Sequence, residues 1–217
     1  MNTKDLVEMV STRRDFLAVV ATFLFAPTAF AQDDEDIFEI KRNREALINA
    51  LNGIPYASEG SGPIIYVFSY STCPYARAFE TDWSGKLSNF EMRRIYYPVD
   101  NQSANETAAL AMSRDVRDYR AFMFEGKRAL DVQRSNEAID AYNAVVERIK
   151  KIIEPTLQQN GFSRKGIISP HFFFSDGLRL FTMGGYTKLL FAKVLKKADL
   201  GRNQSSLFAP NNNRPVH

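Results

Sequence analysis

The only cysteine of the chain stands in a short segment whose residue types and spacing suit thiol chemistry. In "FSYSTCPYARAF", residues 68–79, Cys73 ends an apolar run and is followed by Pro74 and Tyr75. A cysteine in this setting is typical of the first half of a C-x-x-C redox site, in which a thiolate attacks a disulfide and a second thiol resolves the product. The fourth position holds Ala76, so this motif supplies one sulfur where a dithiol site needs two.

Composition limits what else the chain can do. It has 217 residues, 45% of them hydrophobic and 24% charged, which is typical of one globular domain with room for an insertion. The formal net charge is only +3, and the basic pairs Arg93-Arg94 and Lys196-Lys197 are short and lack an accompanying aromatic stripe, so we expect no nucleic-acid binding. One cysteine and two histidines leave no ligand cluster for zinc, and we expect no metal and no cofactor.

Residues 1–31 resemble a twin-arginine signal peptide. Arg13 and Arg14 precede an apolar run over residues 16–25, and an A-x-A cleavage pattern ends at Ala31. The apolar run is shorter than the roughly 20 residues that a membrane span needs. Two other interpretations remain open, an uncleaved membrane anchor and a buried N-terminal helix.

The signal predicts the compartment. Ala18 stands where twin-arginine signals often have lysine, so the general secretory route also remains open. Cleavage after Ala31 would leave a chain that starts at Gln32, without a stable membrane anchor. We therefore expect a periplasmic protein, and a free thiol is unusual in that oxidising compartment.

The elements that must position Cys73 follow from the hydrophobic pattern. Residues 32–62 are expected to form an N-terminal helix, over 36–53, and a linker. The apolar run "PIIYVFSY" predicts a buried strand ahead of Cys73, and Pro74 suits the first turn of the helix that follows. A second strand is expected over residues 90–100.

The second half has a different pattern. Residues 104–160 carry apolar residues at helical spacing and predict two or three helices. An Asp176-Gly177 turn between two apolar runs predicts a hairpin, and an amphipathic helix follows over residues 187–200. Residues 201–217 contain three consecutive asparagines and two prolines and are expected to be disordered.

In order and spacing, these segments resemble the thioredoxin superfamily. The chain is most similar to the periplasmic thiol:disulfide interchange proteins of the DsbC/DsbG type, with a degenerate Cys-Pro-Tyr-Ala site. The resemblance rests on the Cys73 segment, on "FEMRRIYYPVD", and on "ISPHFFFSDGLRLFTMGGYTKLLFAKVL". It implies an α/β, thioredoxin-like fold over residues 63–200, with residues 104–160 inserted before the strand that follows a cis-proline, Pro170. That branch also carries an N-terminal dimerisation domain, whereas only about thirty residues precede the core here, so the oligomeric state stays open.

The resemblance assigns roles at the site. Cys73 would be the nucleophile, partly exposed at a helix N-terminus whose unpaired N–H groups and dipole stabilise a thiolate. Ser169 and Pro170 would orient an extended substrate, with Ser169 facing Cys73 and able to hydrogen-bond its sulfur. Tyr75 would contact substrate, or else only cap the helix.

Several alternatives remain. Pro170 could be a trans proline at a strand start, and His171 could be a proton donor or, more simply, a packed or surface side chain. Cys73 could be active or a relic. The expected partners are extracytoplasmic cysteine-containing proteins or small thiols. The competing hypotheses are a non-redox periplasmic chaperone or binding module that kept the fold, and an assembly factor that acts through the helical insertion.

Overall fold

The structure is a computed structural model that describes residues 36–70, 72–96, 115–125, 136–162, 166–204 and 206–208. All of them belong to one compact unit, residues 34–217. The predicted signal peptide, residues 1–31, lies outside the described residues. In the described part, no helix is long and apolar enough to cross a membrane.

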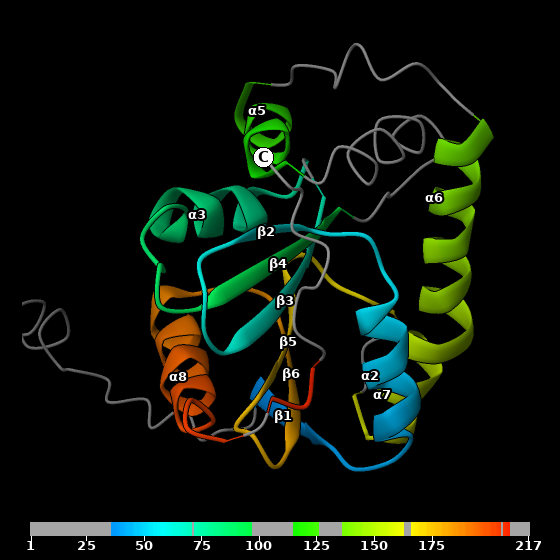
Figure 1. Cartoon of the computed structure of the whole chain (residues 1–217), viewed down its shortest axis with the longest axis vertical. Helices are drawn as coiled ribbons and strands as arrows, with labels where there is room; N and C mark the ends of the chain where they lie inside the picture. The colour runs from blue at the N-terminus through cyan, green and yellow to red at the C-terminus, as the bar shows by residue number, and fades with distance from the viewer. Residues whose placement is uncertain are drawn as a thin grey trace, which may run out of the picture. The chain divides into compact units, whose positions relative to one another are not determined.

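A six-stranded mixed sheet forms the centre of this unit (Figure 1). Its strands are β1 (Ile37–Ile40), β2 (Ala57–Glu59), β3 (Ile64–Ser69), β4 (Glu91–Tyr96), β5 (His171–Ser175) and β6 (Leu180–Gly184). They lie in the order β1-β6-β5-β3-β4-β2. Only β3 and β4 pair in parallel; the other neighbours are antiparallel. The fold is therefore mixed α/β, as the sequence predicts.

The two middle strands are buried because helices cover both faces of the sheet. Along β3, Tyr66 and Phe68 belong to the core on one face, whereas Ile65 and Val67 belong to the core on the other. This is the alternation that a strand imposes, and it explains why β3 is an unbroken apolar run.

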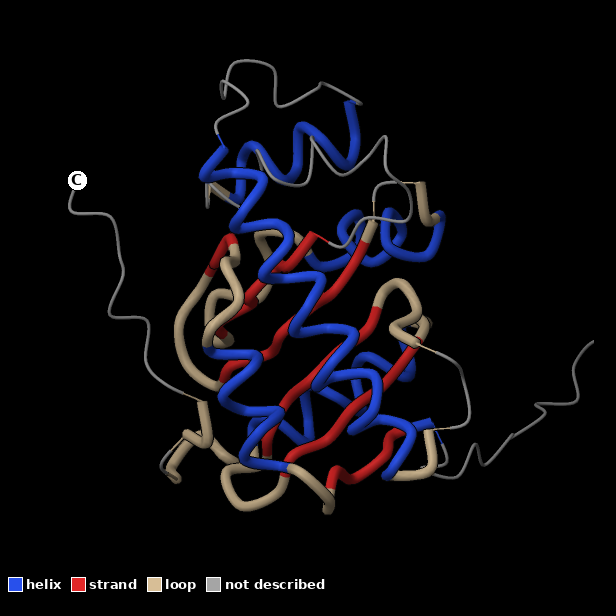
Figure 2. Tube along the Cα trace, turned by 90° about the vertical axis from the view of Figure 1, so that its right-hand side faces the viewer, coloured by secondary structure: helices blue, strands red, loops and turns tan. Residues whose placement is uncertain are grey.

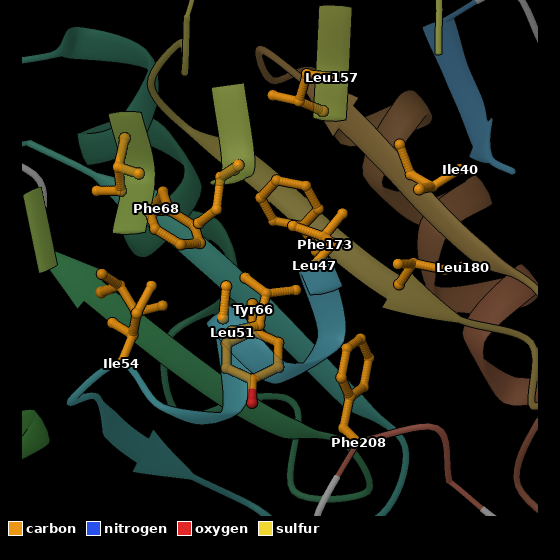
Figure 3. Packing of buried hydrophobic residues seen from close by; sticks show 14 of the residues in the cluster. Ile40, Leu47, Leu51, Ile54, Tyr66, Phe68, Leu157, Phe173, Leu180 and Phe208 are labelled. Carbon is orange, nitrogen blue, oxygen red and sulfur yellow. The ribbon is translucent and has the colours of Figure 1, made fainter. Parts of the chain in front are cut away.

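One face of the sheet is covered by α2 (Arg44–Asn52) and by a continuous helix made of α6 (Asn136–Arg148), a π-helical turn η2 (Ile149–Ile153) and α7 (Glu154–Gln159). Figure 2, seen from this side, shows the continuous helix crossing in front of the strands. Figure 3 shows Leu47 and Leu51 of α2 beside Tyr66 and Phe173 of the sheet. The π turn comes just before Pro155, whose missing N–H interrupts the regular α-helical bonding.

The opposite face is covered by α3 (Pro74–Trp83) and α8 (Lys188–Asp199). Phe79 of α3 and Phe191 of α8 pack edge to face, with ring centroids 4.9 Å apart. The side chain of Thr187 caps α8 by accepting a hydrogen bond from the N–H of Leu190 at 3.1 Å. This layer fixes α3, and therefore Cys73 at its start, against the sheet.

The insertion is helical wherever it is described. Within residues 104–160, the structure describes α5 (Val116–Glu125) and the continuous α6–η2–α7 helix, and no sheet strand occurs in these parts. α5 does not join the α6–α7 layer. It packs near the start of α3 and next to β2.

Two expectations for the N-terminal segment are wrong. The predicted helix over 36–53 begins only at Arg44, because Ile37–Ile40 form β1 and pair with β6. Ile37 and Ile40 face opposite cores, and Asn43, with a φ of 54°, separates the strand from the helix. The expected linker also contains β2, which pairs with β4.

The expectation of a disordered tail over residues 201–217 is wrong for its first part. Residues 201–204 form turns against the preceding helix, and Phe208 is only 2% exposed. Its ring packs against Tyr66, with centroids 5.0 Å apart (Figure 3). An aromatic side chain within a polar asparagine-rich stretch thus completes the core.

Candidate active site

Cys73 occupies the N-cap position of α3, just after the end of β3. Its backbone is extended, with φ −78° and ψ 117°, and Pro74 begins the helix. The Cys73 N–H donates to the carbonyl of Tyr70 at 3.2 Å, and its own carbonyl accepts from Arg77 at 3.1 Å. The predicted position of the thiol at the start of a helix is confirmed.

The thiol contacts the segment that carries Pro170. The Ser169–Pro170 peptide bond is cis, as the resemblance implies. Cys73 Sγ donates a hydrogen bond to the backbone carbonyl of Ser169 at 3.1 Å. The carbonyl of Pro170 accepts from the N–H of Gly185 at 2.8 Å, and Gly185 has a φ of +89° that favours glycine. The Gly185-Tyr186 pair therefore holds the proline segment in place beside the thiol.

The Ser169 hydroxyl and the Ser169 carbonyl have separate partners at the site. The hydroxyl accepts a hydrogen bond from the backbone N–H of Tyr70 at 3.2 Å, so the contact with sulfur comes from the Ser169 main chain. The residue lies next to Cys73 and hydrogen-bonds its sulfur, as expected, through the main-chain carbonyl. The hydroxyl instead fixes the loop between β3 and Cys73.

Tyr70 is a residue of the site that the sequence pattern does not single out. Its side chain packs against the residues around Cys73. Burial raises the pKa of its phenol, and so does the neighbouring Cys73 sulfur when it is ionised. The signal in the sequence was a hydroxyl-bearing aromatic three residues before the cysteine, where the turn that positions Cys73 begins.

The expectation that Cys73 is partly exposed is wrong. Its exposed fraction is 4%. It belongs to a cluster, called here the Cys73 cluster, whose buried members come from β2, β4, α3 and α5: Ala57, Cys73, Ala76, Tyr96, Tyr119, Phe122 and Met123. The helical insertion, through α5, therefore covers the thiol, which the strand-helix-strand pattern alone does not predict.

Polar contacts anchor α5 over this cluster. Arg120 forms an ion pair with Glu59 of β2 at 2.5 Å and donates to the hydroxyl of Ser84 at the end of α3. The Tyr119 hydroxyl hydrogen-bonds with the hydroxyl of Ser69, the last residue of β3. Burial raises the pKa of Tyr119 well above the usual value for tyrosine, so this hydroxyl stays neutral.

A buried ion pair lies behind the cluster. Arg94 of β4 binds Glu80 of α3 at 2.9 Å and Glu59 at 3.1 Å. The side chains of Arg94 and Glu80 are 1% and 0% exposed. Because Glu80 lies one helical turn after Ala76, the pair ties the reactive end of α3 to β4. The sequence pattern predicts β4 but indicates no role for its arginines.

The remaining candidates, Tyr75, Ala76 and His171, differ in exposure. Tyr75 is 61% exposed, so it is free to meet a substrate, whereas Ala76 is fully buried. His171 is also fully buried, and its Nε2 lies 2.7 Å from the Thr182 hydroxyl. Burial lowers the pKa of His171 to about 3, so the ring is neutral. The interpretation of His171 as a packed side chain is confirmed.

Within the part of the chain that the structure describes, no group of three or more histidine, cysteine, aspartate or glutamate side chains could hold a metal ion.

Together, these features define the fold class of the chain. A Cys at the start of α3, a parallel β3–β4 pair around that helix, and a cis-proline ahead of the β5–β6 hairpin are the arrangement of the thioredoxin-like fold. In solved structures, the chain is similar to BcfH of Salmonella enterica Typhimurium, with a TM-score of 0.42 and 10% identity over 90% of this chain and 93% of that one. No family model matches the chain, and no curated protein matches it in sequence. The DsbC/DsbG type therefore remains a prediction from the sequence.

Proposed function

We propose that this chain is an exported thioredoxin-fold protein that carries out thiol–disulfide exchange with Cys73 as its single nucleophile. The observation that carries the proposal is the 3.1 Å contact between Cys73 Sγ and the Ser169 carbonyl. It places the sulfur against the backbone segment that the superfamily resemblance assigns to substrate orientation. A relic cysteine in a binding fold would need no such contact.

The exchange is a balanced two-step reaction. Cys73 loses its proton to solvent, and the thiolate attacks one sulfur of a substrate disulfide. A bond forms between Sγ and that sulfur, the substrate disulfide breaks, and the other sulfur leaves with the electron pair and takes a proton. A second thiol then attacks the mixed disulfide and releases Cys73.

The second thiol must come from outside the chain. Ala76 occupies the position of a resolving cysteine, and Cys73 is the only cysteine. The proposed partners are therefore extracytoplasmic proteins with cysteines, together with small thiols such as glutathione. Tyr75, exposed next to Pro74, is placed to contact such a substrate, and Ser169 and Pro170 to orient it.

The proposed location is the periplasm, reached by the twin-arginine route. Arg13, Arg14 and the cleavage pattern ending at Ala31 support it. N-terminal sequencing of the periplasmic form should begin at Gln32. Replacing both arginines with lysine should stop export; unaltered export of that variant would contradict the twin-arginine route.

A second function has an observation in its favour. Cys73 is only 4% exposed, which suits a non-redox chaperone or binding module whose thiol no longer reacts. In that case the exposed surface around Tyr75 would do the work without the sulfur.

Mass spectrometry after incubation with glutathione disulfide separates the two functions. The wild-type protein should gain one glutathione on Cys73 and lose it when reduced glutathione is added, whereas Cys73→Ala should gain none. Ala76→Cys should instead form an internal disulfide and release glutathione without external thiol, because positions 73 and 76 lie one helical turn apart. Two results together would refute exchange and support the binding function. The wild-type protein would remain unmodified by glutathione, and the Cys73→Ala variant would keep its activity in cells.

A further inference from the structure

One face of α5 is apolar and turned toward the thiol. Tyr119, Phe122 and Met123 are almost completely buried, and all three belong to the Cys73 cluster. They share one side of the helix because residues three and four apart lie on the same face. Phe124 of the same helix is 44% exposed and stands outside the cluster.

The apolar face of α5 rests on three other elements. Ala57 of β2, Ala76 of α3 and Tyr96 of β4 are buried members of the Cys73 cluster, and we call these three residues the seat. The ring of Phe122 meets the ring of Tyr96 edge to face, with centroids 4.8 Å apart. Ala76, which stands where a dithiol site has its second sulfur, is thus a wall of the seat.

With α5 on the seat, a substrate disulfide has no room beside the sulfur. Cys73 is 4% exposed, and the Ser169 carbonyl lies 3.1 Å from Sγ. A thiolate must touch the sulfur that it attacks, so the substrate chain around that sulfur needs space next to Sγ. The exchange reaction therefore requires α5 to leave the seat, and the side chains beside the attacked sulfur to take its place.

The attachment of α5 allows this replacement. The helix has ten residues, fewer than the roughly 12–15 at which an isolated helix becomes stable in water. Its ion pair joins Arg120 and Glu59, whose side chains are 31% and 24% exposed, and such accessible pairs stabilise little. The contacts of Phe122 and Met123 thus hold much of the helix in place, and an apolar partner segment supplies the same kind of contact.

We propose that α5 is an autoinhibitory element, whose apolar face blocks Cys73 by occupying the seat that a substrate must fill. This regulation rests on the proposed exchange function of Cys73. The substrates are disulfides in which aromatic side chains flank a cysteine, because such a side chain replaces Phe122 against Tyr96 as α5 leaves. A small polar disulfide offers no replacement and reacts only when α5 leaves by itself.

The test compares the reaction of the full chain with two peptides. Each peptide has one cysteine in a disulfide with thionitrobenzoate, and phenylalanines flank this cysteine in one peptide and serines in the other. The Cys73 thiolate attacks the peptide sulfur, a bond forms between the two sulfurs, and thionitrobenzoate leaves with the electron pair of the broken disulfide. The absorbance of free thionitrobenzoate therefore measures the rate.

We expect the aromatic peptide to react roughly 10-fold faster, the factor that corresponds to burying most of one aromatic side chain. The chain unfolded in urea should react with both peptides at one rate, which removes any intrinsic difference between them. Equal rates with the folded protein would overturn the proposal.

Three variants assign the effect to α5 and the seat. Phe122→Ala should speed the reaction with both peptides, because α5 leaves more often, whereas Phe124→Ala on the exposed side should change neither rate. Tyr96→Ala should reduce the preference for the aromatic peptide. A merely structural role of Tyr96 would change both rates by one factor, and an unchanged preference in this variant would overturn the proposal.

Hydrogen exchange follows the helix itself and needs no variant. In the mixed disulfide with the aromatic peptide, the backbone amides of α5 should lose protection while those of α8 keep theirs. Retained protection of α5 would overturn the proposal even though exchange proceeds. If wild type and Phe122→Ala both fail to react while the unfolded chain reacts, the exchange function itself is refuted.

Discussion

The carboxylate of Glu80 on α3 and the guanidinium of Arg94 on β4 form an ion pair, 2.9 Å long, with both side chains almost completely buried. One atom of each, Glu80 Oε2 and Arg94 Nη1, has no hydrogen-bond partner among the described residues. Burying charges costs solvation, so each charge depends strongly on the other.

We therefore expect Glu80→Leu to lower the free energy of unfolding by about 3–5 kcal/mol, because Arg94 is left buried with Glu59 alone. Glu147→Gln is the control. It removes an exposed ion pair with Lys151 and should leave the free energy of unfolding almost unchanged. Denaturation by urea measures the free energy of unfolding of both variants. If both lose the same small amount, the buried ion pair does not stabilise the contact between α3 and β4.

His171 predicts a pH dependence of stability. Its pKa is lowered by burial to about 3, below the value of 6.5 in an unfolded chain, so the unfolded state binds more protons at acidic pH. Stability should be complete above pH of about 6.5 and fall as the pH is lowered, by up to about 1.4 kcal/mol per unit.

The variant His171→Phe keeps an aromatic ring next to Phe162 and Phe173 and should flatten this dependence. Thermal unfolding between pH 6.5 and 4.5 is the measurement. Within that window, carboxylates with lowered pKa values, such as Asp82 and Asp176, stay ionised and contribute little. An equally steep loss in the variant would assign the effect to other groups.

Because α5 covers Cys73, we expect alkylating reagents to reach the thiol slowly. Arg120→Ala removes the ion pair with Glu59 and the bond to Ser84, so α5 should leave the Cys73 cluster more often. We expect alkylation of Cys73 to become roughly 2- to 5-fold faster, the factor that corresponds to losing a partly exposed pair. The gain should be larger for a bulky maleimide than for iodoacetamide.

Arg117→Ala is the matched control for this helix. Arg117 is also paired, with Asp115, but its side chain is 85% exposed and its loss should leave the alkylation rate as it is. Identical rates in wild type and Arg120→Ala would mean that α5 does not limit access.

Because the ring of Phe208 is buried, we expect the last described residues to contribute to the stability of the fold. Phe208→Ala removes a ring that packs on Tyr66 in the core and should cost about 3–5 kcal/mol. Leu200→Ala, at a side chain that is 65% exposed, should cost little. If both variants unfold at the same urea concentration as the wild type, Phe208 is not part of the cooperative core.

The elements around Cys73 could be predicted from local signals. An unbroken apolar run gives β3, Pro74 marks the start of α3, and Asp176-Gly177 marks the hairpin. These signals act within a few residues, so one sequence reveals them. The cis form of Pro170 was expected from the surrounding pattern and is confirmed.

The features that were missed depend on residues far apart in the chain. Ile40 has the same helical spacing to Leu47 and Leu51 as a helix residue would have, and only pairing with β6 makes it a strand residue. The burial of Cys73 depends on α5, whose apolar residues predict a helix but not the surface that it covers. Arg94 looks like a solvent-exposed charge until Glu80 and Glu59 are placed beside it.

The position of β1 determines the order in which the chain can be assembled during synthesis. β1 is among the first described segments to emerge, yet its partner β6 follows nearly the whole domain later, and Phe208 later still. Asn160 holds the connection after β1 by accepting from the N–H groups of Lys41 and Arg42 at 2.7 and 2.9 Å, and it also lies far along the chain. A growing chain therefore carries an unpaired strand and an unfinished core until β6 and Phe208 are available, so the native domain can form only after residue 208 has been synthesised.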